Sequence, residues 1–193
     1  MSELMPTREA ALLLLKEYTK SDSLIKHALS VEAVMRHFAK LFDESDIEKW
    51  GIIGLLHDID YELYPEEHCI KARDILKSKN YPESYIHAVE CHGYGICTNV
   101  EPVETMEKVL YTIDELTGLI TATVLMRPSK SILDLEVKSV KKKWKQKSFA
   151  AGVDRDLIEK GAKRLGIEMD KVIEETINGM KAAAEEIGLA GAQ

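Results

Sequence analysis

The chain has 193 residues, of which 45% are hydrophobic and 31% are charged, and its formal net charge is −7 at pH 7. This length suits one domain with a sizeable apolar core, and the composition is ordinary for a globular protein in water. The negative charge argues against a general nucleic-acid coat, and no stretch approaches the roughly eighteen apolar residues of a transmembrane helix. We therefore expect neither a nucleic-acid nor a membrane partner, and the oligomeric state stays open.

Cysteine usage indicates a reducing environment. Cys69, Cys91 and Cys97 are odd in number and lack a C-x-x-C pair, so they indicate neither a disulfide framework nor a thiolate zinc site. The apolar run Leu12 to Leu15 is too short for the core of a signal peptide. We expect a cytoplasmic protein.

The sequence predicts helices almost throughout, because no long alternating apolar–polar run suggests a sheet. Five prolines and eleven glycines separate the segments. The expected helices are about 7–18, a second one carrying an apolar stripe from Leu24 to Phe42, a third begun by a capping box of Ser45 and Glu48, then 66–78, 82–91, 104–126, 131–147, 154–165 and 169–187.

The second helix carries two histidines, which its periodicity places differently. At about 100° per residue, His27 lies about 60° from the centre of the apolar stripe and His37 lies about 140° away. We therefore expect His27 to face a cleft in the core and His37 to face water.

The third helix is apolar on every side from Trp50 to Leu56, as is typical of a buried helix. Its glycines, Gly51 and Gly54, allow a neighbouring helix to approach closely. The helix therefore brings the adjacent pair His57 and Asp58 into the interior at its carboxyl end. Neutral imidazole and ionised carboxylate both bind divalent cations.

A distant aspartate also lies in an apolar helix. The residues three and four positions from Asp114 are Leu110, Tyr111, Thr117 and Gly118, so no basic residue shares its helix face. A buried carboxylate needs a cation, hydrogen bonds or a proton. A divalent ion held by His27, His57 and Asp58 would satisfy this need.

The order His … His-Asp … Asp, with these helical surroundings, resembles the HD-domain phosphohydrolase superfamily over about residues 20–125. The resemblance implies an all-α, HD-domain-like bundle with His27, His57, Asp58 and Asp114 as metal ligands. It extends into residues 127–153, which are similar to the helical tail of uncharacterised HD-type predicted hydrolases. We expect a single domain, residues 1–193, in which the extension 127–193 packs on the core 20–125.

Some members of the superfamily hold two metals through extra histidines between the His-Asp pair and the last aspartate. His68 and His92 occupy that interval here, either as ligands of a second metal or as contacts to a substrate phosphate. His87 is expected to be a solvated or packing histidine. Many two-metal relatives have His-Asp-Ile-Gly followed by lysine, whereas this chain has Asp60 and Tyr61. This difference argues against lysine-assisted chemistry in that loop.

Two imidazoles and two carboxylates leave open positions on an octahedral ion, which suits Mn, Fe, Co, Zn or Mg. A bound ion can lower the pKa of a water from about 15.7 toward about 7, so hydrolysis of a phosphate ester or anhydride is the expected reaction. Asp58 would both ligate the metal and orient the attacking water. Asp60 or Glu62 is the expected proton carrier.

The basic stretch 138–147 has two interpretations. It is either a solvated lysine face or a surface that steers phosphate toward the cleft. In the second interpretation Lys138, Lys142 and Lys145 bind substrate, with help from Arg127 or Lys130.

Three functional hypotheses follow from the sequence. The first is a metal-dependent phosphohydrolase acting on a small phosphorylated metabolite, with a nucleotide as the leading candidate. The second is an HD-type oxygenase that holds two irons. The third is a binding module that senses a nucleotide without turnover.

Overall fold

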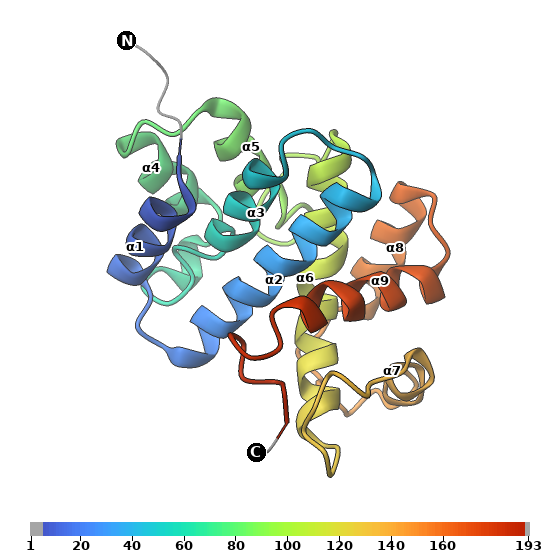
Figure 1. Ribbon diagram of the computed structural model, residues 1–193. Helices are drawn as coiled ribbons and strands as arrows, with labels where there is room; N and C mark the ends of the chain where they lie inside the picture. Colours follow the sequence, from blue (N-terminus) through green and yellow to red (C-terminus); the bar gives the residue numbers. More distant parts are fainter. Residues whose placement is uncertain (1–5, 192–193) are drawn as a thin grey trace.

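Figure 1 shows the computed structural model, in which residues 6–191 are described. Every regular element within that range is helical, and two isolated bridges, Tyr94–Thr98 and Ser131–Ala190, are its β-structure. The all-α class predicted from the sequence is confirmed. The elements are α1 (Arg8–Tyr18), α2 (Asp22–Leu41), α3 (Ile47–Leu56), η1 (Pro65–Glu67), α4 (Ile70–Ser78), α5 (Glu83–Cys91), α6 (Thr105–Leu125), α7 (Val137–Trp144), α8 (Arg155–Leu165) and α9 (Met169–Ala182).

The two longest helices, α2 and α6, contact each other at the centre of the bundle. Helices α3 and α9 pack on α2, and α8 packs on α6, so the carboxyl-terminal helices touch both central ones. The grouping of residues into an HD core and an extension of one domain stays a prediction. None of the helices in the described range combines the length and the apolarity needed to cross a bilayer.

Helix α3 is buried along its length, as its uniform apolarity predicts. A methyl group added to Gly54 would lie 2.9 Å from Cγ of Met35 and 3.1 Å from the backbone of Glu32. Glycine therefore allows α3 to approach the backbone of α2 closely. This approach sets the spacing between the helices that carry His27 and His57.

Several predicted helix ends differ from the observed ones for local reasons. The prediction that Ser45 and Glu48 form a capping box is wrong. Asp46 is the N-cap of α3, and its side chain accepts a hydrogen bond from the Lys49 amide. The predicted helix 66–78 is broken at Cys69, whose φ is +69°. Helix α9 ends at Ala182 instead of continuing to 187.

The predicted helix 131–147 is reduced to α7. The Arg127 guanidinium donates to a carboxylate oxygen of Asp134 at 2.8 Å and to the Ser131 carbonyl at 3.1 Å. These bonds hold residues 131–134 in a loop, so helix formation starts only at Val137.

His37 faces water only in part, so the expectation from helix periodicity is incomplete. Its side chain is 30% exposed and lies 2.5 Å from Oε2 of Glu175 on α9. The hydrophobic stripe of α2 marks one packed face, whereas α9 covers part of the polar side. Packing between distant helices therefore decides the environment of His37.

We predict that Gly54→Ala destabilises the protein by about 1–2 kcal/mol, because the new methyl group meets the α2 backbone. Chemical denaturation measures this change. Gly118→Ala in α6 is the matched control, since its added methyl group reaches an ordinary 3.9 Å contact with Val153. A gain in helix propensity should leave that variant equally or more stable. Equal destabilisation of both variants would contradict the close approach.

The Glu175 contact predicts a pH-dependent contribution to stability. Although burial would raise the pKa of Glu175, hydrogen bonds from Lys171, His37 and Asn178 lower it to about 2, from a usual value of 4.5. The ionised form is favoured in the folded state, so its stabilisation is complete above pH 4.5 and is lost as the pH falls toward 2.

Glu175→Gln should therefore cost about 1–3 kcal/mol at pH 7, as loss of a buried charged hydrogen-bond partner does. Denaturation curves should show this difference shrinking between pH 4.5 and 2. Glu174→Gln is the control, because Glu174 is half exposed and pairs with Lys171 alone. A Glu175→Gln difference that does not change with pH would contradict the assignment.

Candidate metal centre

The four predicted metal ligands converge on one point from different elements. His27 comes from α2, His57 ends α3, Asp58 follows it, and Asp114 lies in the middle of α6. Nε2 of His27 lies 2.9 Å from Oδ1 of Asp114 and 3.2 Å from Nε2 of His57. One ligand atom from each of the four residues lies within 4.8 Å of the others. The group therefore has the dimensions of a site for one cation.

Helix ends fix the orientation of two imidazole rings. His57 is the C-cap of α3, and its Nδ1 lies 2.8 Å from the Gly54 carbonyl. His92 is the C-cap of α5, and its Nδ1 lies 2.5 Å from the Val89 carbonyl. A carbonyl only accepts hydrogen bonds, so Nδ1 is the donor in both residues. Each ring thus satisfies a helix-end carbonyl and leaves Nε2 for a ligand.

When the imidazoles are neutral, hydrogen-bond acceptors face one another in the centre. Nε2 of His57 lies 3.4 Å from Oδ2 of Asp58 and 3.3 Å from Oδ1 of Asp114, in addition to the nearby nitrogen of His27. Lone pairs at these separations repel unless a positive charge lies between them. One proton can bridge only two of these ligand atoms, whereas one metal ion can coordinate all four. The geometry therefore fits a metal better than a set of protons.

The imidazoles and carboxylates of the group each favour the charged form of the other. Burial would lower the pKa of His57, but the carboxylates of Asp58 and Asp114 outweigh burial and raise it well above the usual value. Burial would likewise raise the pKa of Asp114, but His57 and His27 hold it far below the usual range. Burial would also raise the pKa of Asp58, but His57 and His92 hold it well below its usual value. Both carboxylates are therefore ionised at neutral pH, as metal ligands must be.

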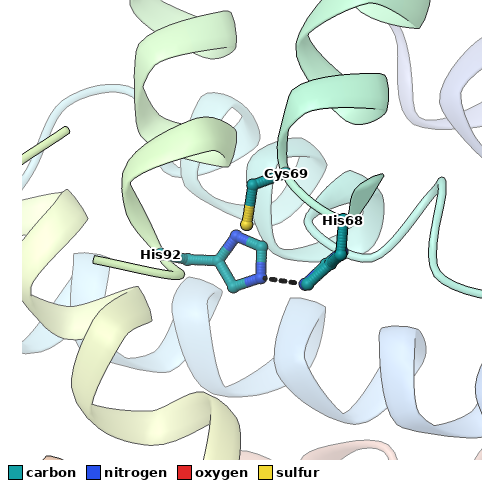
Figure 2. Close-up of side chains that lie close together, drawn as sticks. All are labelled: His68, Cys69 and His92. Carbon is teal, nitrogen blue, oxygen red and sulfur yellow. Dashed lines mark hydrogen bonds between the residues drawn. The ribbon is translucent and has the colours of Figure 1, made fainter. Parts of the chain in front are cut away.

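His68 and His92 form a second group on the other side of Asp58. Their Nε2 atoms lie 3.2 Å apart, and each lies 3.4 Å from Oδ1 of Asp58. Figure 2 shows His68 and His92 joined by this contact, with Cys69 beside them. Since Oδ2 of Asp58 faces His27 and His57, the two oxygens of one carboxylate face two imidazole pairs. The arrangement suits two neighbouring cations that share Asp58.

Asp60 does not occupy the position expected of a proton carrier. It is fully buried, accepts a hydrogen bond from Nδ1 of His68 at 2.7 Å and accepts another from the Ala72 amide at 2.8 Å. Both of its oxygens are thus engaged away from the cavity. Asp60 is a positioning residue that orients His68 and holds the first turn of α4.

Glu62 also has a different role from the expected one. Its carboxylate accepts hydrogen bonds from the backbone amides of Lys20 and Ser21, at 2.8 and 2.9 Å. It therefore ties the loop after α3 to the start of α2. This contact could not be predicted from local sequence patterns, because the partners lie about forty residues apart.

A cavity of about 400 Å³ opens onto both groups. Apart from the histidines and aspartates, its wall includes Leu24, Tyr61, Ile96, Leu157 and Glu115. Burial, followed by the charge of Asp114, raises the pKa of Glu115 to about 7. Sequence reasoning missed Glu115, because a residue next to Asp114 is about 100° away on the helix and was not expected to share its cavity.

The predicted phosphate-binding residues do not line this cavity. Arg127 is engaged with Asp134, and Lys138 pairs with Glu136 at the exposed start of α7. Lys142 on α7 and Lys145, the C-cap of α7, are also exposed. Figure 1 places α7 at the opposite end of the bundle from α4 and α5. The described wall of the cavity contains neither lysine nor arginine. A substrate-binding role for the four basic residues stays a prediction.

A third group of potential ligands, His87, Cys91 and Glu107, has a simpler explanation. Glu107 accepts hydrogen bonds from the Val103 and Glu104 amides and completes the capping box of α6. Its other oxygen lies 2.6 Å from Nδ1 of His87. Hydrogen bonds from His87 and from two backbone amides therefore satisfy both oxygens of Glu107 without a metal ion. His87 was expected to be a solvated or packing histidine, and its side chain is 40% exposed and hydrogen-bonded to Glu107.

We predict that His57→Ala weakens metal binding by more than about 100-fold, since loss of a ligand should exceed the 10–100-fold effect of losing an outer partner. Elemental analysis after equilibration with Mn²⁺ and dialysis measures retention. His37→Ala is the control, because His37 contacts Glu175 away from the centre. Equal metal retention by the two variants would contradict the proposed ligand group.

The comparisons with known proteins agree with this geometry. The family model of the HD domain matches residues 24–119, about half of the chain. The matched range includes His27, the His57–Asp58 pair and Asp114. No solved structure matches the chain. The chain belongs to the HD-domain superfamily, whose members bind divalent metals and are generally metal-dependent hydrolases.

Proposed function

We propose that this protein is a metal-dependent phosphohydrolase that hydrolyses a phosphate ester or anhydride of a small metabolite, with nucleotides as the first candidates. The observation that supports the proposal is the convergence of His27, His57, Asp58 and Asp114 at the base of an open cavity. A site buried without access would serve structure, whereas this one adjoins space for a substrate. We also propose a cytoplasmic location, based on the cysteine usage.

His27, His57, Asp58 and Asp114 would hold the first ion, and His68, His92 and the second oxygen of Asp58 would hold another. Mixed nitrogen and oxygen ligands suit Mn, Fe, Co, Zn or Mg. When bound, the ion supplies a water of lowered pKa and polarises a phosphoryl oxygen. Nδ1 hydrogen bonds from His57, His68 and His92 keep these rings oriented toward the centre.

The cavity wall suggests roles for two other kinds of side chain. Glu115 is the carboxyl group of the wall that lies outside both ligand groups, so we assign it to proton transfer at the leaving group. Leu24, Ile96 and Leu157 offer an apolar surface for the organic part of the substrate. They would also limit the access of bulk water to the reacting phosphate.

The charge of the wall favours a substrate with a single phosphate. Its described residues include no lysine or arginine, and Glu115 adds a further carboxyl group. Metal cations would therefore have to neutralise the phosphate without help from lysine or arginine. One phosphate group suits this arrangement better than a triphosphate chain, so among nucleotides we favour monophosphates.

Two alternatives predict different chemistry. The second imidazole pair at Asp58 also suits an oxygenase with two irons. A nucleotide-sensing module would bind its ligand in the same cavity and release no product. Both alternatives can be separated from hydrolysis by direct measurement.

The decisive experiment measures phosphate release from a panel of monophosphates and nucleotides with added Mn²⁺. We expect turnover of at least one compound and its loss in Asp58→Ala, since Asp58 contacts both ligand groups. Lys142→Ala is the control, because Lys142 is exposed on α7 and does not line the cavity. Tight nucleotide binding without turnover would favour the sensor, and oxygen uptake by the iron-loaded protein would favour the oxygenase.

Glu115→Gln tests the proton-transfer role on any substrate found in this way. Loss of a general acid typically costs about 10²–10⁴-fold in rate, so kcat should fall while KM and metal content change little. An unchanged kcat would remove Glu115 from the mechanism and leave the hydrolase proposal standing.

A further inference from the structure

Two thiols lie side by side next to the second imidazole pair. A methyl group added to Gly93 would lie 2.1 Å from Sγ of Cys97 and 2.5 Å from Sγ of Cys69. Both sulfurs therefore occupy the space that a side chain at Gly93 would fill. Residues 69 and 97 come from the start of α4 and from the turn after α5, so tertiary packing brings them together.

The two sulfurs differ in their exposure. Cys69 is fully buried, whereas Cys97 is half-buried and lines the cavity. A small reagent in the cavity therefore reaches Cys97 first and finds Cys69 behind it. Cys91 is buried elsewhere, where its thiol donates to the Ala88 carbonyl at 3.4 Å.

The proposed metal positions do not use this thiol pair. Nε2 of His68 and Nε2 of His92 face Asp58, while their Nδ1 atoms face Asp60 and the Val89 carbonyl. Figure 2 shows the Cys69 sulfur beside the His92 ring, apart from the contact between the two histidines. Sγ of Cys69 also lies within 4.8 Å of a nitrogen of each ring, but the ring nitrogens have the partners named above, so the two sulfurs remain available to react together.

We propose that Cys69 and Cys97 form a reversible disulfide when the folded protein meets a peroxide or a small-molecule disulfide. Hydrogen peroxide would oxidise the Cys97 thiol to a sulfenic acid and release one water. The Cys69 sulfur then attacks the Cys97 sulfur and expels the second water. Two thiols lose two hydrogens in total, and one peroxide is reduced to two waters. A dithiol such as dithiothreitol reverses the reaction by exchange.

This disulfide would act on the second imidazole pair. Cys69 directly follows His68 and has a left-handed backbone, while Cys97 belongs to the turn that His92 begins. A disulfide requires the sulfurs to approach to about 2.05 Å, which draws the two segments together. His68 would move with Cys69, so we expect the oxidised form to bind a second Mn²⁺ about tenfold more weakly, as disturbed ligand support does. This second effect rests on the proposed metal centre.

The covalent step is tested on the folded, full-length protein with hydrogen peroxide and with oxidised glutathione. We expect intact mass to decrease by two hydrogens and peptide mapping to show a Cys69–Cys97 linkage. Cys69→Ser and Cys97→Ser should abolish the linkage, and Cys91→Ala, the matched control, should retain it. Three unmodified thiols, a stable glutathione adduct on Cys97, or thiols that react only after a chelator is added would overturn the proposal.

Mn²⁺ titration of the reduced, oxidised and dithiothreitol-restored protein tests the consequence. Weaker binding of a second ion in the oxidised form alone, restored by reduction, is the expected result. Identical titrations despite a mapped disulfide would overturn the effect on His68. Failure to bind any Mn²⁺ in the reduced form would instead contradict the proposed metal centre. The mass measurement would still show whether Cys69 and Cys97 form a disulfide.

Discussion

The structure depends on the orientation of imidazole rings by hydrogen bonds from Nδ1. In His57 and His92 the acceptor is the last-turn carbonyl of the helix that each residue caps, and in His68 it is the buried carboxylate of Asp60. Each bond places a proton on Nδ1, so in the neutral form of each ring the Nε2 lone pair points at an oxygen of Asp58. An arrangement of this kind would be repulsive by itself. A bound cation would attract these lone pairs and remove the repulsion. The Nδ1 hydrogen bonds therefore support the proposed metal site.

Rigid helices, rather than loops, hold most of these groups. His27 and Asp114 lie within the two longest helices, and His57 and His92 end two buried ones. Ligands fixed in this way lose little conformational freedom on binding. Asp58 lies in the turn after α3, and His68 follows the short helix η1 and precedes the left-handed Cys69. His68 is therefore a ligand next to the proposed dithiol, where a local change would act on the second position.

Sequence reasoning succeeded where a single helix carried the information. The apolar stripe of α2 was enough to place His27 at the cleft, and the uniform apolarity of α3 was enough to place His57 inside. It failed where the partner lies on a distant element. The contact of His37 with Glu175, the capping role of Glu62 and the presence of Glu115 in the cavity all depend on packing between separate segments. Asp60 combines both cases. Its place next to the His-Asp pair in the sequence predicted a role in proton transfer, whereas its burial and its hydrogen bonds indicate that it positions His68.

The electrostatic cost of the site limits what it can bind. Asp58, Asp60, Asp114 and Glu115 gather in one region of a chain whose net charge is already −7, and the described cavity wall supplies neither lysine nor arginine to offset them. Burial opposes the ionisation of these carboxylates, and imidazoles and hydrogen bonds offset this cost at Asp114 and Asp60. Cations would both relieve this cost and create the one positive patch in the cavity. Anion recognition here would therefore follow from metal binding, and a substrate with charge beyond what the cations neutralise would meet a negative wall.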